Sequence, residues 1–295
     1  MAHDESRLIV AVDGGGSTCR ACVAQLDGRV LGRATGKPAN ISTDFASSRQ
    51  NILDTIGLAY NDAGLSSTRS GADYGYLGLA GATVGGMAAK LRDSLEFFRT
   101  HVGGDLETTV QGALGDGDGT VAMFGTGSFY VTCQGDVYRR VGGWGFRLCD
   151  DGGGAYLGQA LLRLTVQAYD GLVPHSPLTK EILGRYGGTP DKLVTFAQSA
   201  SPLEFGSFAP ELVTAFNSGD ENAAMLIARA VERLEKTLDN LGALSVGPLY
   251  LLGGLGPFYQ DQLRAEYRNI CEKPGGDPLT GAIRLAQIHL IGADQ

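Results

Sequence analysis

The distribution of apolar and polar positions along the chain repeats itself once. A short apolar segment, residues 8–13, runs into a loop of glycine and hydroxyl side chains, and two more segments joined by a glycine turn follow up to residue 34. The same order returns between residues 120 and 141. Each copy predicts a three-stranded antiparallel meander, because short apolar runs bounded by glycine turns are typical of hairpin strands. Internal duplication explains two copies roughly 110 residues apart, and hairpins that arose independently are the alternative.

Longer segments outside the meanders show the period of amphipathic helices. Apolar residues spaced three or four apart indicate one buried helix face, and the longest such stripe, 227–241, follows Asp220, a residue type that caps helices. Short apolar runs predict further strands at 74–79 and 249–252. The segment 187–220 is left without a predicted element. The helices are expected at 45–65, 87–100, 157–169, 178–186, from 220 onward, and at 279–290.

Length and composition favour a globular protein of two domains. A chain of 295 residues exceeds what one typical hydrophobic core organises, and its apolar fraction of 43% is ordinary for folded domains. The 45 glycines are about twice the usual share, which indicates many tight turns and close backbone approaches. The duplication places the boundary near 115–120, with an N-terminal domain over 1–117 and a C-terminal domain over 118–278.

The charge pattern, the lack of long apolar segments and the cysteines argue against a nucleic-acid-binding protein, a membrane protein and a zinc site. With a net charge of −8 and no basic run, the chain is not expected to bind nucleic acid. Residues 1–7 are polar, and no segment approaches the roughly 20 apolar residues of a membrane helix, so we expect a cytoplasmic protein without a membrane partner. The five cysteines are scattered. Cys19 and Cys22 lack the second pair that a zinc site needs, which favours reduced structural thiols.

The loop after the first apolar segment is the first candidate site. Its sequence, Asp13-Gly14-Gly15-Gly16-Ser17-Thr18, places a carboxylate before glycine amides and two hydroxyls. Such amides can surround phosphate oxygens, and the carboxylate can hold a magnesium ion directly or through water. Because the loop joins two hairpin strands and contains no lysine, it is neither a dinucleotide-binding turn, which leads into a helix, nor a P-loop.

Two further glycine loops follow predicted strands. Gly125-Thr126-Gly127-Ser128 occupies the same place in the second meander, and together the two loops could hold a polyphosphate from both sides. The second loop alone is weak support, since such turns are common in β-proteins. Gly253-Gly254-Leu255-Gly256 could let an adenine or ribose approach the backbone, although a tight turn explains it equally well.

A kinase acting on an alcohol also needs a carboxylate that orients the hydroxyl and accepts its proton. Asp116 and Asp118 lie in a Gly-Asp-Gly-Asp-Gly run, for which a turn is the simpler account. Composition does not choose between Asp105 and Asp150. The full set of competing acids is Asp105, Asp116, Asp118, Asp150 and Asp151.

In their order along the chain, these motifs resemble those of the N-acetylglucosamine kinases, which belong to the BadF/BadG-type ATPases of the actin, hexokinase and acetate-kinase superfamily. The resemblance implies an α/β fold of two duplicated ribonuclease-H-like, actin-like ATPase domains. Each would be a mixed five-stranded sheet flanked by helices, with an active-site cleft between the domains and a C-terminal helix, 279–295, packed back on the first. The motifs are DGGGST at 13–18, GLAGA at 78–82, FGTGS at 124–128, GGWGF at 142–146, DDGGGAYLG at 150–158 and LLGGLG at 251–256.

The resemblance also implies a role for each matching position. Asp105 stands where the family has its catalytic aspartate, and Asp13 falls to the phosphates and the magnesium ion. ATP would further contact Gly14, Gly15, Gly16, Ser17, Thr18, Gly125, Thr126, Gly253 and Gly254. The sugar would contact Asn40, Gly81, Thr126, Gly127, Ser128, Gly143, Trp144, Gly145 and Asp150.

The function implied by the resemblance is an ATP- and Mg²⁺-dependent kinase that transfers the γ-phosphoryl to the 6-hydroxyl of N-acetylglucosamine or glucosamine. A homodimer is compatible with this function. One departure leaves the exact sugar open. The family usually has Gly-Asp-Glu-Gly-Ser where this chain has Cys149-Asp150-Asp151-Gly152-Gly153. The alternatives on the same fold are an ATPase module that regulates a partner and a sugar sensor without catalysis.

Overall fold

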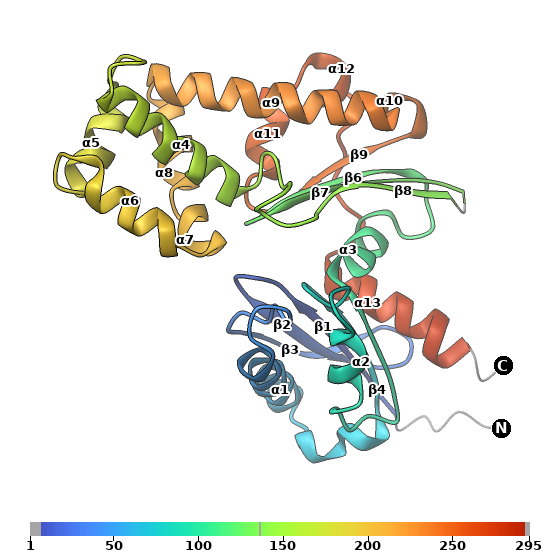
Figure 1. Ribbon diagram of the computed structural model, residues 1–295. Helices are drawn as coiled ribbons and strands as arrows, with labels where there is room; N and C mark the ends of the chain where they lie inside the picture. Colours follow the sequence, from blue (N-terminus) through green and yellow to red (C-terminus); the bar gives the residue numbers. More distant parts are fainter. Residues whose placement is uncertain (1–6, 136, 293–295) are drawn as a thin grey trace. The chain divides into compact units, whose positions relative to one another are not determined.

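The computed structural model describes residues 7–135 and 137–292. It divides into two compact units, one formed by Met1–Asp116 with Lys273–Gln295 and the other by Gly117–Glu272. Each unit has a mixed sheet flanked by helices (Figure 1), which confirms the predicted fold class. Of the C-terminal helix predicted over 279–295, the last three residues lie outside the described part of the chain. No helix within that part is long and apolar enough to span a bilayer.

The first unit contains a five-stranded sheet in the order β3-β2-β1-β4-β5. The first three strands form the predicted antiparallel meander, whereas β1, β4 and β5 run parallel. The strands are β1 (Ile9–Gly14), β2 (Cys19–Ala24), β3 (Val30–Gly36), β4 (Tyr74–Leu79) and β5 (Arg99–Gly104). The helices are α1 (Phe45–Asp62), the 3₁₀ helix η1 (Ser67–Ala72), α2 (Met87–Arg92), α3 (Asp105–Leu114), α13 (Pro278–Ala286) and the π-helix η2 (Gln287–Ile291).

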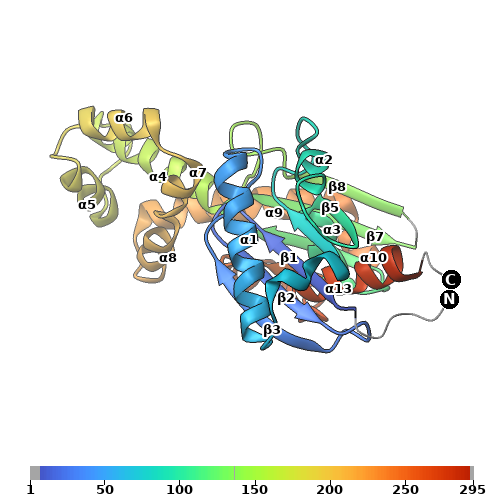
Figure 2. The same ribbon diagram turned by 90° about the horizontal axis from the view of Figure 1, so that it is seen from below.

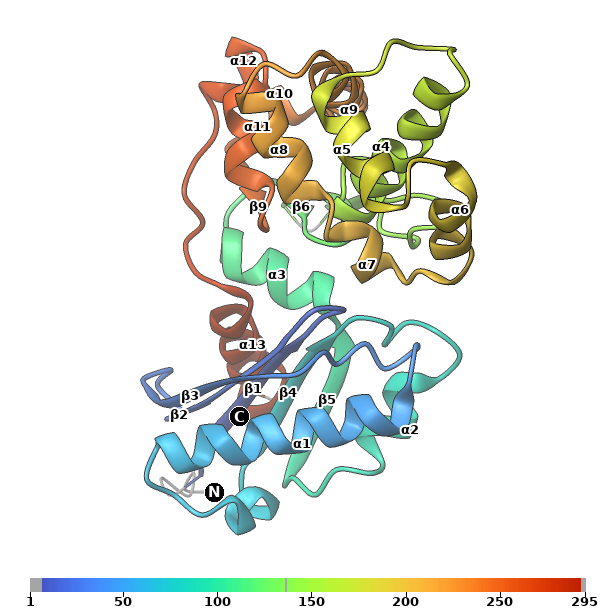
Figure 3. The same ribbon diagram turned by 90° about the vertical axis from the view of Figure 1, so that its left-hand side faces the viewer.

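Both faces of this first sheet are buried. Side chains alternate between the faces along a strand, so Val10 and Val12 of β1 pack with the cluster that includes α1, whereas Ile9 and Ala11 pack with α13. Figure 3 shows α1 and α13 on opposite faces of the strands. Burial on both faces explains why the residues of β1 before Asp13, Ile9 to Val12, are all apolar.

The second unit has a four-stranded sheet in the order β8-β7-β6-β9, with β6 parallel to β9 and the other pairs antiparallel. In Figure 2, α5, α6 and α8 gather to one side of β7 and β8. The strands are β6 (Gly119–Phe124), β7 (Ser128–Gln134), β8 (Val137–Gly142) and β9 (Leu249–Leu252). The helices are α4 (Gly154–Tyr169), α5 (Pro177–Arg185), α6 (Pro190–Ser199), α7 (Pro202–Gly206), α8 (Ala209–Asn217), α9 (Glu221–Leu241), α10 (Ala243–Val246), α11 (Gly256–Gln262) and α12 (Ala265–Arg268).

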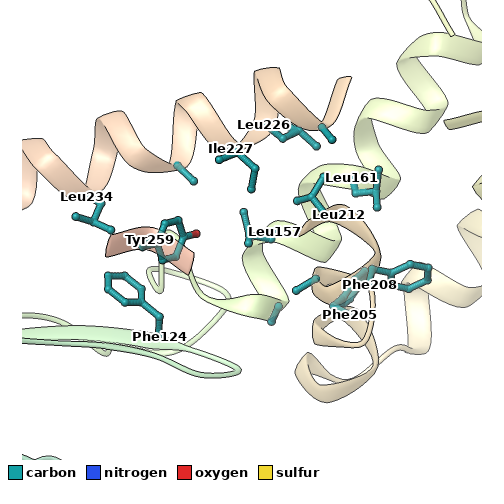
Figure 4. Packing of buried hydrophobic residues seen from close by; sticks show 14 of the residues in the cluster. Phe124, Leu157, Leu161, Phe205, Phe208, Leu212, Leu226, Ile227, Leu234 and Tyr259 are labelled. Atoms are coloured by element: carbon teal, nitrogen blue, oxygen red, sulfur yellow. The ribbon is translucent and has the colours of Figure 1, made fainter. Parts of the chain in front are cut away.

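One hydrophobic core joins the helices and the sheet of the second unit. Figure 4 shows Phe124 of β6, Leu157 of α4, Leu234 of α9 and Tyr259 of α11 among its side chains. The rings of Phe124 and Tyr259 lie 4.8 Å apart, and the Tyr259 hydroxyl donates a hydrogen bond of 2.8 Å to the Gly152 carbonyl. This buried hydrogen bond attaches the loop before α4 to the core.

The helix predicted over 87–100 is wrong beyond Arg92. There α2 ends, and residues 99–104 form the edge strand β5. Arg49 of α1 donates hydrogen bonds of 2.9 Å to both the Oγ and the carbonyl oxygen of Ser94, and so holds the chain in a turn. A contact across 45 residues leaves no trace in local periodicity.

The expectation of five strands in each sheet holds for the first unit and is wrong for the second. In the described residues of that unit, a single parallel bridge between Leu249 and Cys271 lies beside β9, where a fifth strand would continue. Pro274 follows three residues later and cannot donate a backbone hydrogen bond. The region 187–220, for which no element was predicted, contains α6, α7 and α8.

Candidate active site

One edge of the first sheet collects most of the predicted site residues of its unit. The parallel strands place Gly14 beside Leu79 and Leu79 beside Gly104. The loops that follow these strands therefore begin side by side at their carboxyl ends, where α/β proteins commonly bind ligands. Asp13 with its glycine loop, Gly81 and Asp105 all lie at this edge.

Asp13 is an acid with a partner. Its Oδ2 accepts hydrogen bonds from Nε and Nη2 of Arg20, at 3.1 and 2.5 Å, and Arg20 stands directly opposite on β2. Burial raises the pKa of the Asp13 carboxyl, and the nearby guanidinium opposes that rise. Sequence reasoning missed Arg20, although its place next to a hairpin loop, opposite the acid in an antiparallel register, is the signal that could have shown it.

The glycines after Asp13 form a short exposed loop. Gly14 is buried, and a Cβ there would lie 2.5 Å from the Leu79 side chain, so a larger residue would displace that side chain. The Gly15 amide donates to the Thr18 carbonyl at 2.8 Å, which closes the loop. Gly16, Ser17 and Thr18 are exposed. The phosphate-binding role of this loop stays a prediction, and these three exposed residues are the part of the loop that solvent reaches.

Asn40 and Gly81 lie against each other at the same edge. The backbone amide of Ala39 donates to Gly15, and that of Ile41 to Ala80, at 2.9 and 3.1 Å. Asn40 Oδ1 accepts hydrogen bonds from the amide and the hydroxyl of Ser42. A Cβ on Gly81, whose φ is +82°, would lie 2.5 Å from that oxygen. The structure therefore brings this predicted pair together.

Asp105 is the first residue of α3 and directly follows β5. Its carbonyl oxygen accepts hydrogen bonds from the hydroxyls of Thr108 and Thr109, at 3.1 and 2.7 Å, which fix the first turn of the helix. The positive end of a helix dipole stabilises a carboxylate at this position. Asp105 is half-buried, and its catalytic role stays a prediction.

In the second unit, the predicted phosphate loop is tied to the start of α4. The loop closes on itself through the Gly125 amide and the Gly127 carbonyl, at 3.0 Å. The amides of Gly154 and Ala155 donate to the carbonyls of Gly125 and Thr126, at 2.8 and 2.9 Å. The first turn of α4 is thus used to fix this loop and its orientation.

Asp150 is an acid without a full set of partners. It is 6% exposed, and no group among the described residues hydrogen-bonds to its Oδ1. Burial raises the pKa of its carboxyl, opposed by backbone hydrogen bonds from Gly145 and Ser128. Its φ of +70° is the single positive value of a non-glycine residue in 7–135 and 137–292, a strained conformation of the kind that occurs at ligand sites.

The residues around Asp150 are those predicted for the sugar. A Cβ on Gly127 would lie 2.5 Å from Asp150 Oδ2, so the loop backbone passes directly over the carboxylate. Ser128 Oγ donates to the Asp151 carbonyl at 2.8 Å. An unpaired buried oxygen is costly unless a ligand donor meets it. The unpaired oxygen of Asp150 therefore suits a ligand that carries a hydroxyl or amide donor.

Trp144 lies in the loop 142–154, which also carries Asp150. Its side chain is exposed, and the Arg140 guanidinium lies 4.7 Å from the ring centre. Arg140 also donates to the Gly143 carbonyl at 2.5 Å, with Gly143 and Gly145 both at positive φ. The exposed Trp144 ring, in contact with the guanidinium, gives this loop a flat apolar surface. Arg140, which supports the ring, was not predicted from the sequence.

The predicted adenosine motif adjoins the second phosphate loop. Because β9 is parallel to β6, the loops after the two strands leave the same edge of the sheet. A Cβ on Gly253, at φ +82°, would clash with the Phe124 carbonyl, and the Leu255 amide donates to that oxygen at 3.2 Å. A Cβ on Gly254 would meet no atom of the described residues within 4 Å.

Two of the other competing acids, Asp118 and Asp151, have partners in the structure. Asp118 Oδ1 accepts a hydrogen bond of 2.8 Å from the Gly135 amide, and Asp151 pairs with Arg233 at 2.7 Å. Within the described ranges, no three metal-ligating side chains cluster. A single carboxylate such as Asp13 is nevertheless enough for Mg²⁺, which commonly binds one or two carboxylates, water and substrate phosphates.

Comparisons with known proteins identify the family of the chain. The sequence profile of the BadF/BadG/BcrA/BcrD ATPase family matches residues 10–255. Glucosamine kinase GspK of Vibrio cholerae serotype O1 is 28% identical over 278 residues, which cover 94% of this chain and 95% of that protein. A crystal structure from Chromobacterium violaceum, provisionally assigned as an N-acetylglucosamine kinase, has a TM-score of 0.87 at 33% identity, over 95% of this chain and 98% of the other. A ROK family glucokinase from Streptomyces griseus, solved with glucose and AMPPNP, shares the fold alone, with a TM-score of 0.60 at 17% identity over 95% of this chain and 99% of that one.

Proposed function

The chain belongs to the BadF/BadG/BcrA/BcrD ATPase family, and we propose that it is an ATP-dependent amino-sugar kinase that phosphorylates the 6-hydroxyl of N-acetylglucosamine or glucosamine. The observation that carries the proposal is the shared edge of β1, β4 and β5. There an acid at a helix start, an exposed glycine loop and the Asn40–Gly81 pair follow neighbouring strands. The similarity to glucosamine kinase GspK supports the substrate class.

Each acid has a separate task in this proposal. Asp105 orients the sugar hydroxyl and accepts its proton as the oxygen attacks the γ-phosphorus. The amides of the loops after β1 and β6 bind phosphate oxygens. A magnesium ion, when bound near Asp13, would neutralise charge on the phosphates. Asn40 and Asp150 hydrogen-bond the sugar, and Trp144 packs along it.

A panel of sugars tests the proposal. The purified full chain is incubated with ATP and Mg²⁺ and each of N-acetylglucosamine, glucosamine, N-acetylmannosamine, glucose and no sugar, and both ADP and the phosphorylated sugar are measured. We expect stimulation by one of the two glucosamine sugars, with one ADP per sugar phosphate. ATP hydrolysis at the same rate with and without sugar would instead indicate a regulatory ATPase. Sugar binding without a phosphorylated product would indicate a sensor.

A further inference from the structure

A groove between α4 and α9 is not used by the proposed reaction. It encloses about 530 Å³ and lies within the second unit. Its lining follows helical spacing on both helices, so that one stripe of each helix faces the groove. We call it the α4/α9 groove; it is lined by Tyr156, Leu157, Ala160, Arg163, Leu164, Gln167, Leu226, Arg229, Glu232, Arg233 and Lys236.

The charge of the α4/α9 groove is opposite to that of the chain. Four of its lining residues are cationic and only Glu232 is acidic, whereas the whole chain has 24 cationic and 32 acidic residues. Arg163 and Arg229 are exposed and form no ion pair with any described residue. Of the other two cations, Lys236 pairs with Glu232 and Arg233 pairs with Asp151. The guanidinium groups of Arg163 and Arg229 are therefore the two positive charges in the groove that an anionic ligand would neutralise.

The size and the floor of the groove favour a small ligand. Leu157, Leu164 and Leu226 are at most 6% exposed and form an apolar floor beneath the cationic rim. Figure 4 shows Leu157 and Leu226 among the packed side chains between α4 and α9. The volume falls within the range of roughly 300–1,000 Å³ typical of small-molecule sites. Arginine forks bind phosphate oxygens in pairs, so a phosphate monoester with a modest carbon skeleton fits this combination.

Arg233 connects the groove to the predicted sugar site. Its Nη1 lies 2.7 Å from Asp151 Oδ1, and the two side chains are 55% and 43% exposed. Such an exposed pair contributes little, so a phosphate dianion in the groove can compete for the guanidinium. Asp151 directly follows Asp150, and its carbonyl accepts the Ser128 hydroxyl at 2.8 Å. Release of Asp151 would therefore loosen the loop that holds Asp150.

We propose that the α4/α9 groove is a regulatory site for a small sugar phosphate, and that its occupation draws Arg233 from Asp151 and weakens sugar binding at Asp150. The binding of the ligand stands independently of catalysis, whereas the regulatory role rests on the proposed kinase function. A kinase of this kind would thereby respond to the class of product that it forms.

Isothermal titration of the full chain tests the binding site. Glucosamine 6-phosphate and inorganic phosphate are titrated separately into the wild type, the double variant Arg163→Gln/Arg229→Gln, and the control Lys180→Gln, which alters an exposed cation on α5 outside the groove. We expect the double variant to bind the sugar phosphate at least about tenfold more weakly at one site, since two charged contacts are lost. The control should match the wild type.

Two results would overturn the assignment of the ligand. Wild-type affinity and stoichiometry in the double variant would show that the groove binds no sugar phosphate. Inorganic phosphate that binds as tightly as glucosamine 6-phosphate would show that the groove recognises the free ion instead. Glucosamine 6-phosphate that binds at the active site does so in the wild type and in both variants. It therefore does not change the difference between them.

Trp144 provides a test of the coupling that needs no turnover. It is the chain's one tryptophan and lies in the loop of Asp150, so its fluorescence reports sugar binding directly. We expect glucosamine 6-phosphate to weaken N-acetylglucosamine binding about fivefold or more in the wild type. In Arg163→Gln/Arg229→Gln, any weakening of N-acetylglucosamine binding that remains is due to competition at the active site. In Arg233→Gln the weakening should be no larger than in that double variant. A full response in Arg233→Gln would refute the coupling, and absent phosphoryl transfer with intact groove binding would refute the kinase proposal alone.

Discussion

The loops after β1 and β6 occupy equivalent places in two sheets with the same order of neighbouring strands, yet the acids at these loops differ. In the first unit the acid, Asp13, belongs to the strand itself and is paired with Arg20. In the second, Asp150 arrives from a segment beyond β8, is buried, and has an oxygen without a partner. A paired acid at an exposed loop suits charged phosphates and a cation, and a buried acid with an unpaired oxygen suits the hydrogen-bond donors of an amino sugar. If both loops bind ligands as proposed, the same order of neighbouring strands provides two kinds of ligand site.

The largest expected effect concerns a third acid, Asp105, which belongs to neither loop. Asp105→Asn keeps the shape of the side chain and removes its ability to accept a proton. We expect kcat to fall by about 10²–10⁴, the usual contribution of a general base, with ATP binding unchanged. Steady-state kinetics and ATP titration measure the two quantities. Glu107→Gln, an exposed acid in the same helical turn, is the control, and near-normal turnover of Asp105→Asn would rule out its assigned role.

The packing of the loop after β9 against the end of β6 can be tested at two neighbouring glycines, Gly253 and Gly254. Gly253→Ala forces a left-handed alanine against the Phe124 carbonyl, so we expect a loss of about 2–4 kcal/mol in the free energy of unfolding. Gly254→Ala enters open space and should stay within about 0.5 kcal/mol of the wild type. Urea denaturation compares the two variants. Equal losses would mean that the loop after β9 is not held against β6.

Asp150→Asn should separate sugar binding from stability. Asparagine tolerates positive φ but loses the charge, so we expect KM for the sugar to rise about tenfold or more. Because burial raises the pKa of Asp150, ionisation costs the folded state stability as pH rises from about 3.9 through that raised pKa. The variant should therefore be more stable than the wild type at pH 7, with the difference shrinking in acid.

Urea denaturation at several pH values measures this effect, with the exposed Asp170→Asn as control. A variant that is less stable at neutral pH would show that the Asp150 charge is compensated in the folded protein.

The smallest effect is expected in the first unit, where Asp13 is paired with Arg20. Arg20→Ala removes the partner of Asp13, and because the arginine is 38% exposed the loss of folding free energy should be about 1 kcal/mol or less. Lys37→Ala, an exposed cation near the same loop, is the control. Urea denaturation decides the outcome. A loss several times larger would mean that Asp13 depends on Arg20 as strongly as a fully buried ion pair does.

Local patterns predicted the elements whose signals are local. The meanders, α1, β4, α9 and β9 follow from apolar periodicity, turn glycines and the Asp220 cap. The edge strand β5 was missed because it is only partly buried and shows little apolar alternation. The fifth strand expected in the second sheet is reduced to one bridge, since proline and glycine follow Cys271 closely.

The sequence by itself indicated where the glycine loops lie, because glycines directly after short apolar runs are typical of tight turns that follow strands. Their order along the chain was enough to indicate the family. Only the tertiary structure decided the state of each acid: Arg20 reaches Asp13 through strand register, and Gly127 passes over Asp150 because α4 fixes the second loop. The charge state and the strain of a side chain depend on neighbours distant in sequence, and a linear pattern does not contain them.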